Sequence, residues 1–173
     1  MTNTNDIAKP RLVIVTGGQS GVDRAALDVA LALSIPYAGF CPRGGWAEDL
    51  PEPPGLLAHY PLLVETPLAD PAQRTEWNVR DSDAVLVLTA GTGLAGSKGT
   101  TLAQAVAVRD GKPSLVLSVD EPDAAARATR WLDDILSAHG NEPLRLGIGG
   151  PRESEAPGIY GRAVAVLQVV LRG

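Results

Sequence analysis

Short, mostly apolar runs alternate along the chain with longer segments in which apolar residues recur every three or four positions. The short runs predict buried strands at 12–16, 36–40, 62–65, 84–88, 114–119 and 144–148. The periodic segments predict helices at 22–33, 71–81, 100–109, 124–137 and 160–171. Strands that alternate with helices indicate an α/β fold, a single Rossmann-like domain whose mostly parallel sheet carries helices on both faces.

The length of the chain fits one such domain. Its 173 residues lie in the usual range for a single domain and suffice to bury a core without disulfide bonds. We therefore expect residues 11–173 to form one Rossmann-like ligand-binding domain. The opening segment, MTNTNDIAK, is polar and lacks the apolar centre of a signal peptide, so residues 1–10 are expected to form a disordered tail.

Three glycine-rich loops follow predicted strands, after Thr16, Thr89 and Ile148. In open α/β sheets, ligands bind beyond the carboxyl ends of the strands. Glycine lets the backbone approach a phosphate closely, and the first turn of a helix supplies free N–H donors and partial positive charge. Loops 17–21 and 91–101 lead directly into helices, so we predict that they cradle a phosphate-bearing small molecule. The alternative for each loop taken alone is a tight connection without a ligand.

Cations beside these loops complete the predicted anion site. Arginine binds phosphate through two parallel hydrogen bonds, and lysine acts as a point charge. The predicted ligand-binding residues are Gly17, Gly18, Gln19, Ser20, Gly21, Arg24, Arg43, Arg74, Gly91, Gly96, Ser97, Lys98, Gly99, Thr100, Thr101, Arg152 and Ser154. Neither main loop has the Walker A order or the G-x-G-x-x-G fingerprint, which argues against an ordinary P-loop or dinucleotide site.

Composition and charge narrow the classes of partner. The net charge of −5 argues against a nucleic-acid-binding surface. No stretch approaches the roughly 20 apolar residues that a membrane span needs. The single cysteine, Cys41, excludes an internal disulfide and a cysteine-rich zinc site, and favours a cytoplasmic location. His59 and His139 lack metal-ligand spacing, so no catalytic metal is expected.

Four segments together carry a family resemblance: TGGQSGVDRA at 16–25, CPRGGWAED at 41–49, RTEWNVRDSD at 74–83 and GPRES at 150–154. The combination resembles the molybdenum-carrier family, bacterial relatives of the molybdenum-cofactor carrier proteins, within the lysine-decarboxylase-like or SLOG group of Rossmann-like proteins. The resemblance covers residues 12–171. It implies a homo-oligomer, a dimer or tetramer, that binds a phosphorylated nucleotide-like ligand. That ligand would be molybdenum cofactor, held without turnover, or molybdate, an oxyanion that the same N–H groups can hold.

One departure bears on catalysis. Related cytokinin-activating phosphoribohydrolases carry a P-G-G-x-G-T motif followed closely by a glutamate needed for cleavage. Here the run is AGSKGTTLAQ at 95–104, with no carboxylate after Thr100. We therefore expect a binding or carrier protein with no catalytic residue.

Two alternatives to a carrier stay open. The first is a nucleotide-processing enzyme, such as an N-glycosidase of nucleoside monophosphates, whose base would be Glu48, Asp49 or Glu76. The second is an interaction module whose glycine loops are only connections. Cys41 is expected to be a buried thiol, with contact to a metal or dithiolene as the alternative.

Overall fold

Five parallel strands form the main sheet, in the order β2–β1–β7–β5–β6. The computed structural model describes residues 11–91 and 96–172, so the expected tail at 1–10 and positions 92–95 of the second glycine loop lie outside the described residues. The strands are β1 (Leu12–Val15), β2 (Tyr37–Ala38), β5 (Ala84–Thr89), β6 (Ser114–Ser118) and β7 (Leu144–Gly149).

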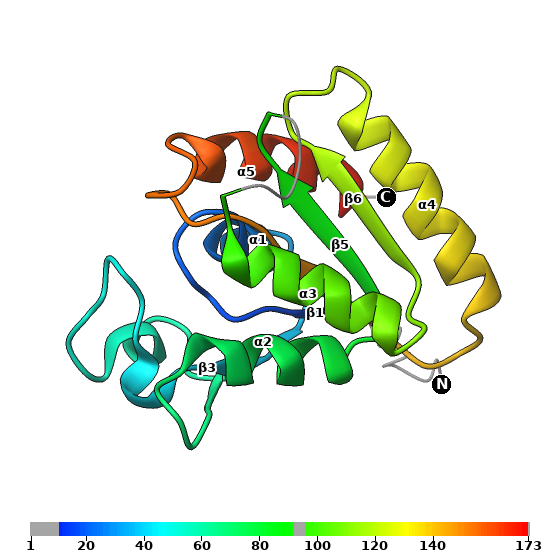
Figure 1. Ribbon diagram of the computed structural model, residues 1–173. Helices are drawn as coiled ribbons and strands as arrows, with labels where there is room; N and C mark the ends of the chain where they lie inside the picture. Colours follow the sequence, from blue (N-terminus) through cyan, green and yellow to red (C-terminus); the bar gives the residue numbers. More distant parts are fainter. Residues whose placement is uncertain (1–10, 92–95, 173) are drawn as a thin grey trace, which may run out of the picture.

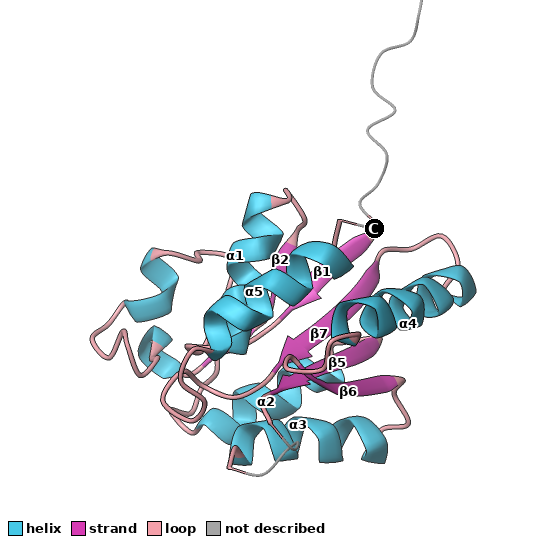
Figure 2. Cartoon of the chain, turned by 90° about the horizontal axis from the view of Figure 1, so that it is seen from above, coloured by secondary structure: helices cyan, strands magenta, loops and turns pink. Residues whose placement is uncertain are grey.

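Helices cover both faces of this sheet. One face carries α1 (Val22–Ala32), α4 (Ala124–Ala138) and α5 (Ile159–Val170), and the other carries α2 (Pro71–Arg80) and α3 (Lys98–Arg109) (Figures 1 and 2). The predicted α/β class, a Rossmann-like domain with a parallel sheet between two helical layers, is confirmed. None of the described helices is long and apolar enough to cross a membrane.

The central strand β5 shows why the apolar runs predicted buried strands. All of its residues are buried, and alternate side chains point to opposite faces of the sheet. Leu86 and Leu88 pack into the core beneath α1, α4 and α5. Val85 and Val87 pack against α2 and α3 on the other face. A strand covered on both faces needs apolar side chains at every position, which removes the polar–apolar alternation of a half-exposed strand.

The strand predicted at 36–40 is divided at Gly39 into β2 and β3 (Phe40–Cys41), which corrects that prediction. Gly39 has a φ of +141°, and a Cβ there would overlap the backbone of Thr16, so glycine allows the chain to bend away from the main sheet. β3 then pairs with β4 (Val64–Glu65) in a separate two-stranded parallel sheet.

The long segment between β3 and β4 packs against the domain although it has little regular structure. It contains two short 3₁₀ helices, η1 (Arg43–Gly45) and η2 (Gly55–Ala58). Ala47 and Leu56 of this segment are fully buried in the main core. The segment therefore holds a fixed position beside the start of α1.

The chain leaves the sheet in opposite directions around β7. From β1 it passes through α1 to β2 at one edge, and from β5 it passes through α3 to β6 at the other. The carboxyl ends of β1, β7 and β5 are consequently neighbours, with no helix crossing above them. This is the topological switch point at which open α/β sheets bind ligands.

Candidate functional site

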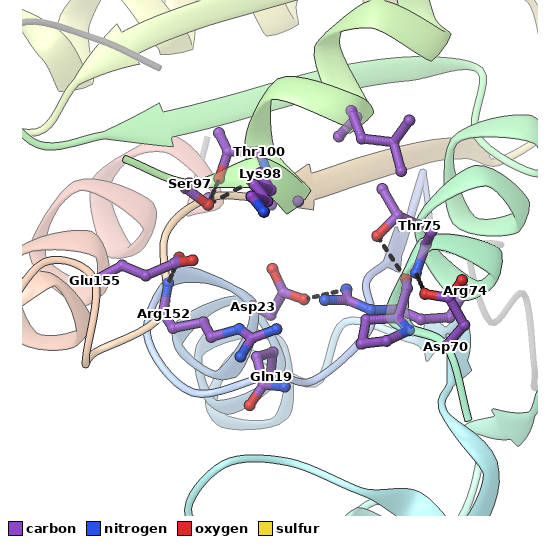
Figure 3. A pocket seen from close by; sticks show the side chains of 17 residues that line it. Gln19, Asp23, Asp70, Arg74, Thr75, Ser97, Lys98, Thr100, Arg152 and Glu155 are labelled. Atoms are coloured by element: carbon purple, nitrogen blue, oxygen red, sulfur yellow. Dashed lines mark hydrogen bonds and ion pairs between the residues drawn. The ribbon is translucent and has the colours of Figure 1, made fainter. Parts of the chain in front are cut away.

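A cleft of about 310 Å³ lies at this switch point (Figure 3). It is lined by the β1–α1 loop, the start of α3, the β7–α5 loop and the first turns of α2. Of the predicted ligand-binding residues, the structure brings seven together here: Gln19, Arg74, Ser97, Lys98, Gly99, Thr100 and Arg152. The predicted convergence of three loops after β1, β5 and β7 is therefore present in the fold.

The first turn of α3 forms one wall of the cleft. Ser97 caps the helix, since its Oγ accepts from the backbone N–H of Thr100 at 3.4 Å and from Thr100 Oγ1 at 2.7 Å. The N–H groups of Lys98 and Gly99 belong to the first turn, where a helix has no carbonyl to offer them. A Cβ on Gly99 would meet no described residue within 4 Å, so this backbone is open to an approaching group. Helix-terminal N–H groups with a lysine beside them favour an anion.

The floor of the cleft holds a buried ion pair between α1 and α2. Arg74 Nη1 lies 2.8 Å from Asp23 Oδ2, and both side chains are largely buried. Burial raises the pKa of the Asp23 carboxyl above its ordinary value, against the opposing effect of the Arg74 guanidinium. The backbone N–H groups of Gln19 and Gly150 also donate to this carboxylate. One amide of the predicted phosphate cradle, that of Gln19, therefore binds a carboxylate of the protein itself, as does the amide of Gly150 in the third glycine-rich loop.

Gln19 lies in the floor beside this pair and is only 3% exposed. Its Oε1 accepts from the backbone N–H of Ser20 at 3.1 Å and from that of Glu48 at 2.9 Å. Its Nε2 is buried and has no hydrogen-bond partner among the described residues. A buried donor without an acceptor is costly, so this group is poised for a partner that enters the cleft.

Arg152, in the β7–α5 loop, adds a cation on the side opposite Arg74 (Figure 3). Its guanidinium lies 5.6 Å from the ring centroid of Trp46. Its backbone N–H donates to Glu155 at 2.9 Å. The charged side chains that line the cleft balance one another: Asp23, Asp70 and Glu155 against Arg74, Lys98 and Arg152.

At the start of α1, unlike that of α3, the polar side chains are already paired with carboxylates of the long segment. The Ser20 hydroxyl donates to Glu48, and Arg24 makes two hydrogen bonds to Asp49, at 2.9 and 3.0 Å. Ser20, Gly21 and Arg24 line a separate hollow of about 390 Å³ instead of the main cleft. These three residues therefore do not share a cavity with the seven cleft residues, as joint binding of one phosphate would require.

The remaining predicted residues also lie outside the cleft. Gly17 packs beneath Arg74, and Gly18 faces three core leucines. Gly91 and Gly96 line an adjoining hollow, and the N–H of Gly91 donates to Asp120 at 2.9 Å. Arg43 is exposed in η1. The Thr101 hydroxyl donates to the Ser97 carbonyl, and Ser154 bonds Glu48.

Glu48 joins three segments that are distant in sequence. It accepts from the Ser20 hydroxyl, and from the hydroxyl and backbone N–H of Ser154 at 2.5 and 3.2 Å. Partial burial raises the pKa of Glu48, but the hydrogen bonds from Ser154 and Ser20 outweigh burial and hold this pKa below its ordinary value. The carboxylate therefore ties Ser20, just before α1, to the long segment and to the β7–α5 loop.

The three carboxylates expected to act as the base of a nucleotide-cleaving enzyme, Glu48, Asp49 and Glu76, do not line the cleft. The carboxylates that do line it, Asp70 and Glu155 among them, were not assigned from the sequence. Asp70 carried a detectable signal, since an aspartate directly before Pro71 is typical of a helix N-cap. Its Oδ1 indeed accepts from the Ala72 N–H at 2.9 Å.

Cys41 is fully buried and does not line the cleft. Burial, together with the neighbouring Glu65 carboxylate, raises the pKa of its thiol to about 11, so the thiol stays protonated at neutral pH. In the part of the chain that the structure describes, no group of three or more His, Cys, Asp or Glu residues is arranged to hold a metal ion.

Comparison with the profiles of known protein families identifies the family of the chain. The profile of the circularly permutated YpsA SLOG family matches residues 14–171, which span the fold and the whole cleft. The chain belongs to this family. The SLOG membership predicted from the four sequence segments is thereby confirmed.

One solved structure resembles this SLOG protein over nearly its whole length. It is that of a protein from Syntrophus aciditrophicus SB named "putative molybdenum carrier protein", which is 35% identical in sequence. The match covers 94% of this chain and 97% of that one, with a TM-score of 0.79. The comparison with curated proteins gave no match.

Proposed function

We propose that this SLOG protein binds a phosphorylated, nucleotide-like small molecule in the cleft and acts as a carrier for it. Molybdenum cofactor is the first candidate ligand and molybdate the second, supported by the name of the similar protein from Syntrophus aciditrophicus SB. The observation that carries the proposal is the open first turn of α3. Lys98 and Gly99 line the cleft there, and no described side chain approaches a Cβ built on Gly99, whereas Ser20 at the start of α1 is already bonded to Glu48.

In the proposed complex, the phosphate lies against the first turn of α3. The N–H of Gly99 and the Lys98 ammonium supply donors and positive charge there. Arg152, from the β7–α5 loop, lines the same cleft and lies on the side of Asp23 and Gln19 (Figure 3). The rest of the ligand extends over Gln19, Asp23 and Arg74. The protein holds the ligand, and the proposal includes no chemical step.

Isothermal titration with molybdenum cofactor, molybdate and nucleoside monophosphates tests this function. Replacing Lys98 with alanine removes a charge from the phosphate subsite and should weaken binding about tenfold, the scale of one charge-assisted hydrogen bond. Arg130→Ala is the matched control, because it removes the same charge from an exposed position on α4. Absence of saturable binding by the wild type, or equal affinity in Lys98→Ala, would contradict the proposal.

Two further properties remain predictions from the sequence. Homo-oligomerisation rests on the family resemblance, and a cytoplasmic location rests on the use of a single cysteine. Size-exclusion chromatography with light scattering would test the first, with a dimer or tetramer as the expected result.

A further inference from the structure

Gln19 lies in the floor of the cleft, and its Nε2 group is a buried donor. None of the described residues provides an acceptor for this group. The side chain is 97% buried, as its 3% exposure implies. Most buried polar groups in folded proteins have a hydrogen-bond partner, and one without a partner costs free energy. The position of this group in a ligand-sized cleft makes a ligand atom the natural acceptor.

The orientation of the Gln19 amide is fixed by its surroundings. Two backbone N–H groups, those of Ser20 and Glu48, point at the same end of the amide, at 3.1 and 2.9 Å. Only an oxygen can accept from both, so the NH₂ group must occupy the other end. The end of the Gln19 amide that is left without a partner is therefore a donor, and the side chain cannot rotate to present an acceptor instead.

The charge beside Gln19 limits what the acceptor can be. The Asp23 carboxylate accepts from the backbone N–H of Gln19 itself, and it is neutralised by Arg74 at 2.8 Å. A second anion placed at the Gln19 amide would meet this carboxylate, and because Arg74 is already paired with Asp23, Arg152 alone of these neighbours would offset the repulsion. An uncharged oxygen or nitrogen would meet no such repulsion. The anionic part of the ligand is better placed across the cleft, at Lys98 (Figure 3).

The size of the cleft supports a ligand with two distinct parts. A volume of about 310 Å³ lies at the lower end of the range of roughly 300–1,000 Å³ that is usual for sites of small organic molecules. A bare tetrahedral oxyanion at the first turn of α3 would leave the Nε2 group of Gln19, in the floor of the cleft, without an acceptor. The balanced charge of the lining also fits an organic ligand better than a compact dianion.

Building on the proposed function, we propose that Gln19 determines the specificity of the cleft by donating to an uncharged acceptor on the organic part of the ligand. The cleft then selects an organic phosphate whose ring bears a carbonyl oxygen or an unprotonated nitrogen. It discriminates against inorganic phosphate, molybdate and phosphates that lack such a ring. Gln19 acts as the specificity residue, and the first turn of α3 acts as the general anion subsite.

The test uses four probes with the full chain at pH 8: guanosine 5′-monophosphate, ribose 5-phosphate, inorganic phosphate and molybdate. Guanosine 5′-monophosphate and ribose 5-phosphate share the sugar phosphate, and the nucleotide adds the ring acceptors. The informative variant is Gln19→Glu. Its carboxylate keeps an oxygen for the Ser20 and Glu48 N–H groups but presents an acceptor to the cleft where the amide donated. Gln168→Glu, at the far end of α5, is the control for the added charge.

We expect the wild type to bind guanosine 5′-monophosphate at least about tenfold more tightly than the other three probes, because only this probe carries a ring with acceptors that extends beyond the sugar phosphate toward Gln19. Gln19→Glu should lower the affinity for the nucleotide about tenfold and leave ribose 5-phosphate within about twofold. Gln168→Glu should change neither affinity. Urea denaturation of each variant establishes that the fold is retained, and Gln19→Met, which lacks any donor, provides a second test if Gln19→Glu is unstable.

The outcomes separate the inference from the function on which it rests. If the wild type binds guanosine 5′-monophosphate no better than ribose 5-phosphate or molybdate, Gln19 does not select the ligand. The same conclusion follows if the Gln19 variants lower the affinities for both sugar phosphates equally, or lower neither. If the wild type binds none of the four probes, the inference is contradicted, and the proposed function is then decided by the titration with molybdenum cofactor.

Discussion

At Gly18 the backbone has a φ of +72°, and the space that a side chain would take is filled by core leucines. A Cβ there would lie 3.1–3.3 Å from methyl groups of Leu63, Leu27 and Leu56. Gly99 differs in both respects, because its φ is helical and the space around it is empty. Of these two glycines from the predicted phosphate loops, Gly18 serves the packing of the core, and Gly99 leaves room for a ligand.

Replacing Gly18 with valine should therefore destabilise the fold. The left-handed φ is unfavourable for a β-branched residue, and the added methyl groups overpack the core, so together we expect a loss of about 2–4 kcal/mol in the free energy of unfolding. Urea denaturation followed by circular dichroism measures this loss. An unchanged denaturation midpoint would show that the loop rearranges at no cost and that the described packing of Gly18 is incorrect.

Several residues that were assigned to the ligand site from residue type alone do line the cleft, although their role in binding stays a prediction. Lys98 and Gly99 at the start of a helix, and Arg152 beside a proline in a loop, were assigned to the ligand site and lie in the cleft. Arg24 was assigned by the same logic, but Asp49 from the long segment takes its guanidinium. Since that contact spans 25 positions in the sequence, local patterns gave no sign of it.

Among the elements, the long segment between β3 and β4 is tied to the start of α1 by Glu48. This carboxylate also binds Ser154 in the β7–α5 loop, so one side chain holds three segments together. The pKa of Glu48 is held below its ordinary value of 4.5. A carboxyl with a lowered pKa stabilises the native state fully above its unfolded-state pKa, and this stabilisation is lost as the pH falls through the lowered value.

Glu48→Gln should accordingly lower the free energy of unfolding by about 1 kcal/mol at pH 7, since the amide accepts fewer and weaker hydrogen bonds than the carboxylate. The difference between variant and wild type should shrink as the pH falls below about 4.5, because the wild-type carboxyl then becomes protonated. Urea denaturation between pH 7 and pH 3 measures the trend. Glu52→Gln, an exposed position in the same segment, should show no comparable difference.

A difference between wild type and Glu48→Gln that stays constant across this pH range would contradict the described role of the ionised carboxylate. A loss of stability of the same size in Glu52→Gln would instead indicate a general effect of charge in the long segment.

The regular elements were largely predictable because their patterns are local. The run 84–88 and the helical period of 124–137 correspond to β5 and α4 with small shifts at the ends. The strand at 36–40 was predicted as continuous, because the pattern of apolar residues does not indicate the bend at Gly39. The contacts of the irregular segment after β3 with the start of α1 depend on long-range packing that periodicity does not encode.

For the whole molecule, alternation of strands and helices was enough to predict the sheet type and the edge where the loops converge. The order of the strands, with the last one placed between β1 and β5, determines which loops share the cleft. That order brings α3 and the β7–α5 loop opposite Gln19 and Arg74. Several of these residues were predicted from the sequence. The difference between the two helix starts was not: Ser20 before α1 is bonded to Glu48, whereas the start of α3 is open to the cleft.

The central claim, a small phosphorylated ligand held at the start of α3, is tested most directly by native mass spectrometry of the purified chain. Gly99→Val places methyl groups over the open N–H groups, and Gly161→Val makes the same change on α5, where a Cβ also meets nothing within 4 Å. The wild type and Gly161→Val should carry the additional mass of a phosphorus-containing small molecule, and Gly99→Val should lack it. Identical spectra for the wild type and Gly99→Val would contradict the claim.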